Sequence, residues 1–475
     1  TLTVLGTVQG SMSSVSESLY DVVVIGGGAS GTALLYILSH YTDLKRIALI
    51  EKYPTLGAVN SNAKNNSQTL HVGDIETNYS LEKAKQVKPA AMMVAEYAKR
   101  LSADQQSHIL KKVQKMILAV GATEVTQLEK RYEDIKTLFP ELQKLDREGI
   151  HAKEPAVVNG RDAKEPILAL FNPEGYAVNF GALAASFAEQ AQQMTGKTID
   201  VFLDQEVREI VRKDEMYLLE TNKQTISARV VVVDTDAYSL GFAKRLGYGT
   251  QFSLIPIAGT FYFSPPFLNG KVYTMQEPRM PFAAVHGDPD LTRTDATRWG
   301  PTARFFPVLE SRDLKTLIAY LRSSGLHRIQ TWLSFVTILL EPIRFKYLAK
   351  NVLYELPYLG KYLFLPQDRK IIPTIKGSDL ERAGDYGGMR LQRVDTTTRE
   401  LLLGEGKIVG ENIIFNMTPS PGASVCLYNA IRDAEQIMTF LQGSFRFEKN
   451  RALADLSPQE VASTKDVSLK ESYPS

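Results

Sequence analysis

A glycine-rich turn between two apolar strands constrains the fold of this chain more than any other feature. Residues 20–25 are β-branched and apolar almost throughout, and Gly26, Gly28 and Gly31 follow them in the spacing Gly-x-Gly-x-x-Gly. An apolar helical segment comes next, and a second strand at 46–50 completes a βαβ unit long enough for a parallel crossover. This order predicts an α/β fold with a Rossmann-like dinucleotide-binding domain.

The residues of this unit match the needs of a dinucleotide. Gly28 lets the backbone approach a pyrophosphate, and Gly31 allows the helix to pack closely on the strand. The first turn of the helix offers unpaired N–H groups to the phosphates. Glu51 ends the second strand, where a carboxylate binds ribose hydroxyls. The predicted contacts are Gly26, Gly28, Ala29, Ser30, Gly31, Glu51 and Lys52.

The C-terminal part of the sequence favours FAD over NAD as the dinucleotide. A strand at 412–416 ends in a turn of small residues, which starts a helix reaching about residue 441. Such a helix start can direct N–H groups at the pyrimidine edge of a flavin and stabilise the charge of its reduced form. An ordinary turn with a helix cap would give the same pattern, whereas a nicotinamide enzyme would not need this ending. The predicted flavin contacts are Pro421, Gly422, Ala423 and Ser424.

Nucleotide-type signals at the start, middle and end of the chain predict one discontinuous domain with an α+β domain inserted into it. The chain does not begin with Met and has a Ser-rich opening, which is left out of the fold prediction. The predicted FAD-binding domain comprises residues 19–80, 160–250 and 385–445, the substrate domain comprises 81–159 and 251–384 with a helical insert at 313–354, and the termini 1–18 and 456–475 are predicted to be loose.

Charge and cysteine content narrow the class of function. The 55 Lys and Arg residues nearly balance the 53 Asp and Glu residues, and this lack of basic excess argues against a nucleic-acid partner. The single cysteine, Cys426, excludes an internal disulfide and a thiolate zinc site, and no metal site is predicted. No run of 18 apolar residues occurs, so no membrane-spanning helix is predicted.

Several separate motifs occur in one order along the chain: Gly26–Gly31, Ser61–His71, Asn78-Tyr79, Phe282–Asp288, Gly300–Thr302 and Pro419–Ala423. Together they resemble the malate:quinone oxidoreductase family. The likeness covers approximately residues 20–445 and is closest to the short bacterial branch. It implies an FAD-dependent, membrane-associated dehydrogenase that oxidises malate to oxaloacetate in the tricarboxylic acid cycle and passes electrons to a respiratory-chain quinone. The family is also similar to flavin 2-hydroxyglutarate oxidases and to the glycine- and D-amino-acid-oxidase fold group.

The resemblance also implies further cofactor contacts and shows two departures. Where relatives often read Asn-Ala-Gly, this chain has Asp234-Thr235-Asp236, and two acids there would disturb a pyrophosphate contact. The amphipathic insert around 318–354 matches the family poorly. The further predicted cofactor contacts are Asn66, Ser67, Gln68, Thr69 and Val207.

Oxidation of a 2-hydroxy acid requires a base for the hydroxyl proton while the C2 hydrogen leaves as hydride. A neutral histidine, with an ordinary pKa of ~6.5, suits this task. Four of the six histidines lie in charged helical or loop surroundings, and His71 and His286 remain. We predict that His286, in a glycine-bounded turn, is the base and that Asp288 orients it. His71 is predicted to support the flavin side, and the roles of the two histidines stay open.

A dicarboxylate substrate needs cations, and arginine suits planar bidentate pairing. Arg390 and Gln392 match an Arg-x-Gln pattern of the family, so we predict that Arg390 binds the substrate and that Gln392 assists. Arg304, shortly after a Gly-Pro-Thr motif, is predicted as a second clamp.

An apolar stripe in the helical insert allows two interpretations. Leu326, Ile329, Leu333, Val336 and Leu340 recur at helical spacing, and a second stripe follows Pro342. The pattern alone favours a core-facing helix hairpin, whereas an acceptor dissolved in lipid favours peripheral membrane contact through residues 326–354. The resemblance then implies ubiquinone or menaquinone as partner and an energy-transducing inner membrane as the location. The start of the chain favours the mitochondrial membrane over a bacterial cytoplasmic one.

Other functions stay open on the sequence. An FAD oxidase or dehydrogenase acting on 2-hydroxyglutarate or an amino acid would show similar motifs. The departures also leave room for a non-catalytic flavin-bearing subunit of a membrane complex, and association with a respiratory assembly is a further prediction.

Overall fold

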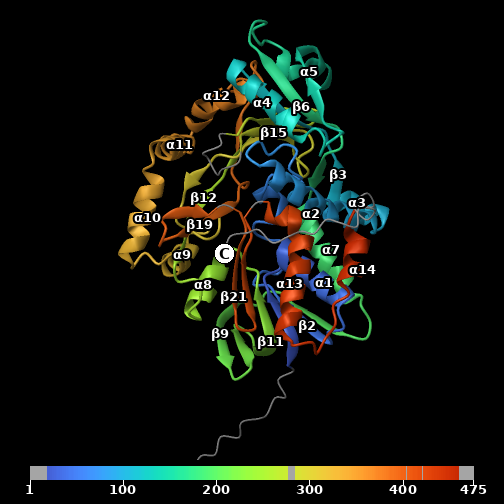
Figure 1. Ribbon diagram of the computed structural model, residues 1–475. Helices are drawn as coiled ribbons and strands as arrows, with labels where there is room; N and C mark the ends of the chain where they lie inside the picture. The colour runs from blue at the N-terminus through green and yellow to red at the C-terminus, as the bar shows by residue number, and fades with distance from the viewer. Residues whose placement is uncertain (1–18, 277–283, 403, 420, 459–475) are drawn as a thin grey trace, which may run out of the picture.

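A parallel sheet at the lower half of the molecule carries the nucleotide-type strands (Figure 1). The computed structural model describes residues 19–276, 284–402, 404–419 and 421–458. The five parallel strands run in the order β22, β11, β1, β2, β8. The Rossmann-like α/β prediction is therefore confirmed. The strands of this sheet are β1 Tyr20–Ile25, β2 Arg46–Ile50, β8 Thr198–Phe202, β11 Thr225–Val233 and β22 Ile413–Met417, with β9 Val207–Lys213, β10 Met216–Thr221 and β21 Gly406–Gly410 antiparallel.

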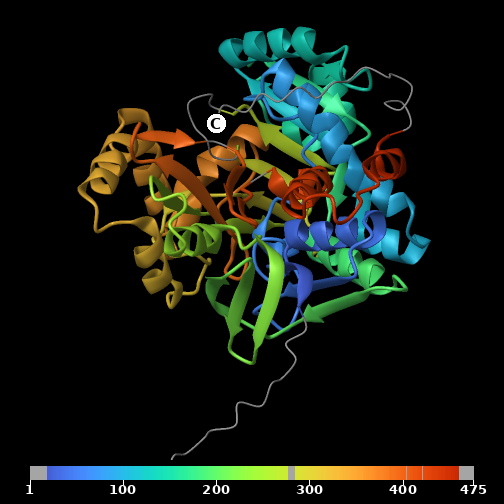
Figure 2. The ribbon, with the colours of Figure 1, turned by 60° about the horizontal axis from the view of Figure 1, so that its bottom comes forward.

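Strand β1 is apolar on both faces because the sheet is covered on both sides. Val22 and Val24 point into a core that includes the helices α1 Ala29–Tyr41 and α13 Cys426–Phe440. Val23 and Ile25 point into a second core on the other face. Figure 2 shows α1 and α13 side by side against the sheet.

A second sheet forms the upper half of the molecule and is mixed. Its order is β18, β13, β16, β15, β14, β4, β6, β5, with only β14 and β4 parallel. Trp299 and Phe364 pack in the core between this sheet and helix α12 Gly360–Ile371. The strands are β4 Lys115–Val120, β5 Gln143–Leu145, β6 Ile167–Asn172, β13 Phe261–Ser264, β14 Lys271–Thr274, β15 His286–Pro289, β16 Thr297–Gly300 and β18 Glu381–Ala383.

The structure differs from the predicted domain limits at several elements, including one strand and one helix. Strand β6 lies within the predicted segment 160–250 but pairs in the second sheet. Helix α2 Leu81–Lys99 begins the predicted substrate segment but shares the core of α1 and α13. The loose termini, as well as Phe282, Ala283 and Ser420 of the quoted motifs, lie outside the described residues. The other elements are α3 Ala103–Ile109, α4 Ala122–Ile135, α5 Arg147–Lys153, α6 Pro155–Val158, α7 Phe180–Gln192, α8 Ala237–Arg245, α14 Lys449–Leu456, β3 Leu110–Lys112 and β7 Tyr176–Val178.

A small third sheet connects the two halves to the helical insert. Its order is β17 Arg304–Phe305, β12 Phe252–Ala258, β19 Met389–Asp395 and β20 Glu400–Leu402. The helices α9 Thr316–Ser324, α10 Ile329–Leu339 and α11 Pro342–Leu353 follow one side of the molecule, at the left of Figure 1. Phe335, Ile338 and Leu348 pack on this sheet. Because the predicted stripe lies mostly on the opposite, exposed face of α10, the core-facing interpretation is wrong.

Candidate active site

A cavity of about 350 Å³ lies where the strands β1, β2 and β11 end. Ligands of open α/β sheets bind at the carboxyl ends of such strands. The opposite wall comes from the second and third sheets and includes Ile257, Tyr273 and Arg390. The cavity therefore joins the nucleotide-type turn to the inserted part of the chain.

The glycine turn leaves its backbone open to this cavity. Gly26 has a φ of +113°, and a Cβ there would lie 2.3 Å from the carbonyl oxygen of Asp234. A Cβ at Gly31 would lie 2.1 Å from the carbonyl oxygen of Gly26, which explains why Gly31 packs behind the turn and does not line the cavity. Gly28, Ala29 and Ser30 line the cavity, and their contacts with the cofactor stay predictions.

The end of β2 closes the nucleotide side of the cavity. Glu51 Oε2 accepts a hydrogen bond from Gly27 N at 2.7 Å, and burial raises the pKa of this carboxyl. Lys52 lines the cavity and forms an ion pair with Glu310. Tyr53 and Tyr238 also donate their hydroxyls to Glu310, at 2.5 and 2.7 Å. The sequence did not suggest Glu310, because it lies in a loop between β17 and α9.

The Asp234-Thr235-Asp236 segment lines the cavity beside the glycine turn. Burial raises the pKa of Asp236 to about 6, and Asn60 donates to its carboxylate at 2.9 Å. Burial also raises the pKa of Asp234 well above its ordinary value. A raised pKa favours the neutral form of a carboxyl, which reduces the repulsion that two acids would exert on a pyrophosphate.

The predicted cofactor loop splits between the cavity and the protein interior. Asn66, Ser67 and Thr69 line the cavity. Gln68 has a φ of +50° and turns away from it, and its Nε2 donates to Asp290 at 2.9 Å. The prediction that Gln68 contacts the cofactor is therefore corrected by the structure. Pro421, Ala423, Ser424 and Val207 line the cavity, so their cofactor contacts stay predictions, whereas Gly422 does not line it.

His71 is paired with a carboxylate, whereas the prediction placed a carboxylate partner beside His286. Its Nδ1 lies 2.5 Å from Glu76 Oε1, and its Nε2 lies 3.1 Å from the hydroxyl of Ser67. Burial opposes ionisation of Glu76, but the hydrogen bond from His71 prevails and lowers the pKa of this carboxyl. Glu76 was not predicted, although its position five residues after His71 is a possible signal for such a pair.

His286 also lines the cavity but has different neighbours from those predicted. It begins strand β15 rather than lying in a turn, and its ring stacks on Tyr273 with 4.5 Å between centroids. Nδ1 lies 3.1 Å from the carbonyl oxygen of Ala284, and buried Nε2 has no partner among the described residues. Asp288 pairs with Lys271 and not with His286, which corrects the predicted dyad. Burial lowers the pKa of His286 to about 4, although Asp288 raises it.

Of the three predicted substrate residues, only Arg390 lines the cavity. Arg390 lies on β19 opposite Ile257 of β12. Gln392 is on the same strand but is buried outside the cavity lining. Arg304 lies outside the cavity lining as well; it pairs with Glu355 at 4.0 Å and stacks over Phe306. The structure therefore does not support the roles predicted for Gln392 and Arg304.

Comparison with known proteins identifies the family of this arrangement. The family model for malate:quinone oxidoreductase matches residues 18–307. The malate:quinone oxidoreductase of Helicobacter pylori is 42% identical over 450 residues, which are 93% of this chain and 99% of the relative. The chain belongs to the malate:quinone oxidoreductase family.

More distant relatives share the fold of this family. Human mitochondrial L-2-hydroxyglutarate dehydrogenase is 25% identical over 90% of this chain and 91% of its own length. The FAD-bound structure of L-α-glycerophosphate oxidase from Mycoplasma pneumoniae has a TM-score of 0.60 at 17% identity, covering 89% of this chain and 95% of that one. The second similarity shows the fold alone.

The cavity of this malate:quinone oxidoreductase family member fits FAD, the cofactor of the family. Gly28 opens α1 without a side chain, so phosphates can approach the backbone of the first turn, where Ala29 N donates to Ser61 Oγ at 3.0 Å. The nearest atom to a Cβ built at Gly28 is Ser61 Oγ at 3.4 Å, so the approach is open. The lining also includes Glu51 and the small residues Ala423 and Ser424. This chemistry suits a dinucleotide.

Proposed function

We propose that this protein oxidises malate to oxaloacetate and delivers the electrons, through FAD, to a membrane quinone. Membership of the malate:quinone oxidoreductase family supports this reaction. One observation in the structure carries it: Arg390, which forms no ion pair among the described residues, and His71, whose ring is paired with Glu76, both line the cavity that contains the glycine turn.

Arg390 supplies the charge that a dicarboxylate substrate needs. Burial lowers the pKa of this guanidinium, and the groups that counteract this effect are the phenols of Tyr79 and Tyr347. Among the described residues no carboxylate forms an ion pair with Arg390. A buried guanidinium is stabilised when an anion pairs with it, and its fork matches a carboxylate in two hydrogen bonds. We therefore place a malate carboxylate on Arg390.

His71 is the better placed of the two histidines to take the hydroxyl proton. Because Nδ1 faces the Glu76 carboxylate, Nδ1 carries the hydrogen, and the lone pair of Nε2 accepts from the Ser67 hydroxyl in the resting protein. The substrate hydroxyl takes the place of that donor when it transfers its proton to Nε2. Glu76 then stabilises the imidazolium that forms when Nε2 takes a proton. Bound FAD supplies the acceptor for the hydride that leaves C2. His286 lacks a carboxylate partner, so we assign it a neutral role beside the substrate.

Anaerobic spectroscopy of the purified protein tests this function directly. Malate is expected to bleach the absorbance of bound FAD within seconds, whereas 2-hydroxyglutarate and amino acids leave it unchanged over the same time. Bleaching by one of those compounds in place of malate would assign the enzyme to another substrate. Failure of every compound to reduce the flavin would favour a non-catalytic flavin-bearing subunit.

An apolar surface on the helical insert supports a peripheral position on the membrane. No helix in the described part of the chain has both the length and the apolar character to cross a bilayer. Most exposed large apolar side chains of the described residues nevertheless lie between positions 314 and 363. A large exposed apolar region of this kind typically marks a contact with a membrane or with another protein. This helical apolar surface consists of Leu314, Ile318, Leu321, Ile329, Trp332, Leu333, Val336, Leu340, Phe345, Val352, Leu353, Leu356, Tyr358, Leu359, Tyr362 and Leu363.

The charge of the same region matches an anionic lipid surface. Residues 313–376 contain ten Lys and Arg residues and four Asp and Glu residues. Lysines such as Lys346 and Lys350 can extend to the headgroups while the apolar side chains enter the acyl boundary. The helices also pack on the sheet of Ile257 and Arg390, both of which line the cavity. We propose that residues 326–354 hold the cavity close to the membrane that contains the quinone.

Polar substitutions on this surface are expected to release the protein from vesicles. Ile329→Ser combined with Val336→Ser removes two side chains that are 65% and 51% exposed. We expect at least a roughly tenfold decrease in partition to anionic vesicles in a flotation assay, because each buried CH₂ contributes about 0.8 kcal/mol. Val211→Ser with Val409→Ser, exposed on other elements, is the matched control. Equal losses in both variants would contradict the proposed surface.

The proposed location is the surface of an energy-transducing inner membrane, with ubiquinone or menaquinone as acceptor. The Helicobacter relative is bacterial, which supports the bacterial cytoplasmic membrane. The mitochondrial membrane and association with a respiratory assembly stay predictions. Quinone reduction by the isolated chain on vesicles would show that no further subunit is required.

A further inference from the structure

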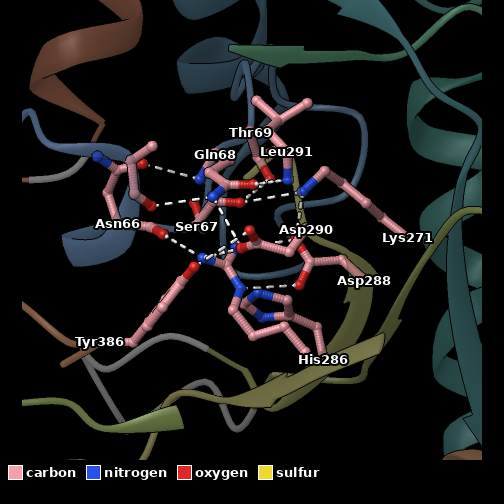
Figure 3. Close-up of polar contacts among 12 residues, drawn as sticks. Asn66, Ser67, Gln68, Thr69, Lys271, His286, Asp288, Asp290, Leu291 and Tyr386 are labelled. Carbon is pink, nitrogen blue, oxygen red and sulfur yellow. Dashed lines mark hydrogen bonds and ion pairs between the residues drawn. The ribbon is translucent and has the colours of Figure 1, made fainter. Parts of the chain in front are cut away.

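Four charged side chains that do not line the cavity are buried together, and Figure 3 shows three of them, Lys271, Asp288 and Asp290, beside Ser67 and Gln68. Lys271, Asp288 and Arg298 are completely buried, and Asp290 is 2% exposed. Arg298 binds both oxygens of Asp288 at 3.0 and 3.2 Å and reaches Asp290 at 3.2 Å. Lys271 lies 2.5 Å from Asp288. Lys271 lies on β14, Asp288 on β15, Arg298 on β16 and Asp290 in the loop after β15. These four residues form a buried charge cluster with two charges of each sign.

Stability alone does not explain such a cluster. Apolar residues of similar volume often stabilise a core as well as buried ion pairs do, because removing charges from water is costly. The cluster, however, has contacts that apolar residues could not replace. Arg298 donates to the carbonyl oxygen of Asn66 at 3.1 Å, and Lys271 donates to that of Ser67 at 3.0 Å. The cluster therefore specifies the position of the cofactor-side loop.

Gln68, the next residue of the same loop, is also held by hydrogen bonds. Gln68 donates to Asp290 at 2.9 Å, and its Oε1 accepts from Leu291 N at 2.9 Å. Three consecutive residues of the loop are thus bound to the inserted second sheet and the loop after β15. The middle one, Ser67, is the residue whose hydroxyl lies 3.1 Å from His71 Nε2. A continuous chain of contacts leads from the charge cluster to the ring of His71.

We propose that Lys271 and Arg298 are positioning residues for proton transfer. They hold the loop so that the Ser67 hydroxyl sets the orientation of the His71 ring. This inference rests on the proposed function in one respect, namely that His71 takes the proton of the substrate hydroxyl. A displacement of about 1 Å in a reacting group can cost about 10²-fold in rate.

A charge-balanced variant tests the proposal without leaving an unpaired buried charge. Lys271→Met with Asp288→Asn removes one charge of each sign and the hydrogen bond to the Ser67 carbonyl. We expect the maximal rate of FAD reduction by malate to decrease about 10- to 100-fold. The malate concentration at half-saturation should change less than about threefold, because Arg390 is untouched. An unchanged rate in the folded, FAD-loaded variant would overturn the proposal.

A double-mutant cycle separates positioning from general damage. Ser67→Ala removes the last link of the chain of contacts, so the Lys271→Met/Asp288→Asn changes should have little further effect in that background. Fully multiplicative losses would show that the cluster does not act through Ser67.

Arg161→Met is the matched control, since Arg161 is also buried and donates to the carbonyl oxygens of Val157 and Lys370 but does not line the cavity. It should lower the melting temperature and leave the reduction rate unchanged.

A readout that needs no turnover distinguishes this inference from the proposed function. The ¹⁵N resonance of His71 Nε2, assigned by its loss in His71→Gln, reports the hydrogen bond from Ser67 in the resting FAD-loaded protein. We expect the same displacement of this resonance in Ser67→Ala and in Lys271→Met/Asp288→Asn. A wild-type resonance in the cluster variant would overturn the positioning role. Failure of malate to reduce the wild-type flavin would instead overturn the proposed function and leave this result standing.

Discussion

His71→Gln is expected to slow the reduction of bound FAD by malate about 10²- to 10⁴-fold, the usual range for loss of a general base. Glutamine keeps a similar volume but cannot take a proton at Nε2, and Glu76 then has no imidazolium to stabilise. Because His71 lies in the wall of the cavity and not in the glycine turn, FAD content should stay close to that of the wild type. Stopped-flow absorbance under anaerobic conditions measures the rate.

His286→Gln is the comparison that decides between the two histidines. His286 is buried and stacks on Tyr273, and its pKa of about 4 makes its neutral ring a weak base. We expect its replacement to reduce the rate much less than replacement of His71. A larger loss in His286→Gln at equal FAD content would reverse the assignment and restore the base predicted from sequence.

Arg390→Met is expected to lower kcat/KM for malate about 10²- to 10⁴-fold. Two charge-assisted hydrogen bonds to a carboxylate contribute about 1.5–3 kcal/mol each, and methionine keeps the apolar part of the side chain while removing both. Steady-state kinetics with a water-soluble electron acceptor measures the effect independently of the membrane. Most of the loss should be in KM if the carboxylate is held equally in substrate and transition state.

Arg393→Met provides a matched control on the same strand. Arg393 lies over the ring of Phe252 and does not line the cavity. Its replacement should change kcat/KM for malate less than about threefold, because surface-side cations contribute little to a distant anion. Equal losses in the Arg390 and Arg393 variants would mean that the substrate is held elsewhere.

Local sequence was sufficient for the nucleotide-type turn. Gly26 and Gly31 are required by contacts within one strand–turn–helix unit, so their spacing carries the structural information. The strand β1 is buried on both faces, and its continuous apolar run predicts this correctly. The family resemblance then placed His71 and Arg390, which the structure brings to one cavity.

Local sequence could not predict which polar side chains pair with one another in the interior. Asp288 lies two residues from His286 on β15, which suggested a pair. Strand β15 lies between β14 and β16, however, and these supply the cations Lys271 and Arg298. Two full charges at about 3 Å compete successfully with a neutral imidazole for one carboxylate.

The sequence by itself determined the parallel nucleotide-binding unit, the discontinuous architecture and the family, because these depend on local backbone needs and on motif order. Only the tertiary structure decided that Glu76 partners His71, that Gln68 turns inward and that the stripe of α10 faces outward. Periodicity shows that a helix has an apolar face, but what covers that face depends on elements far away in the chain. The same holds for buried charges, whose partners are selected by strand order and not by distance along the sequence.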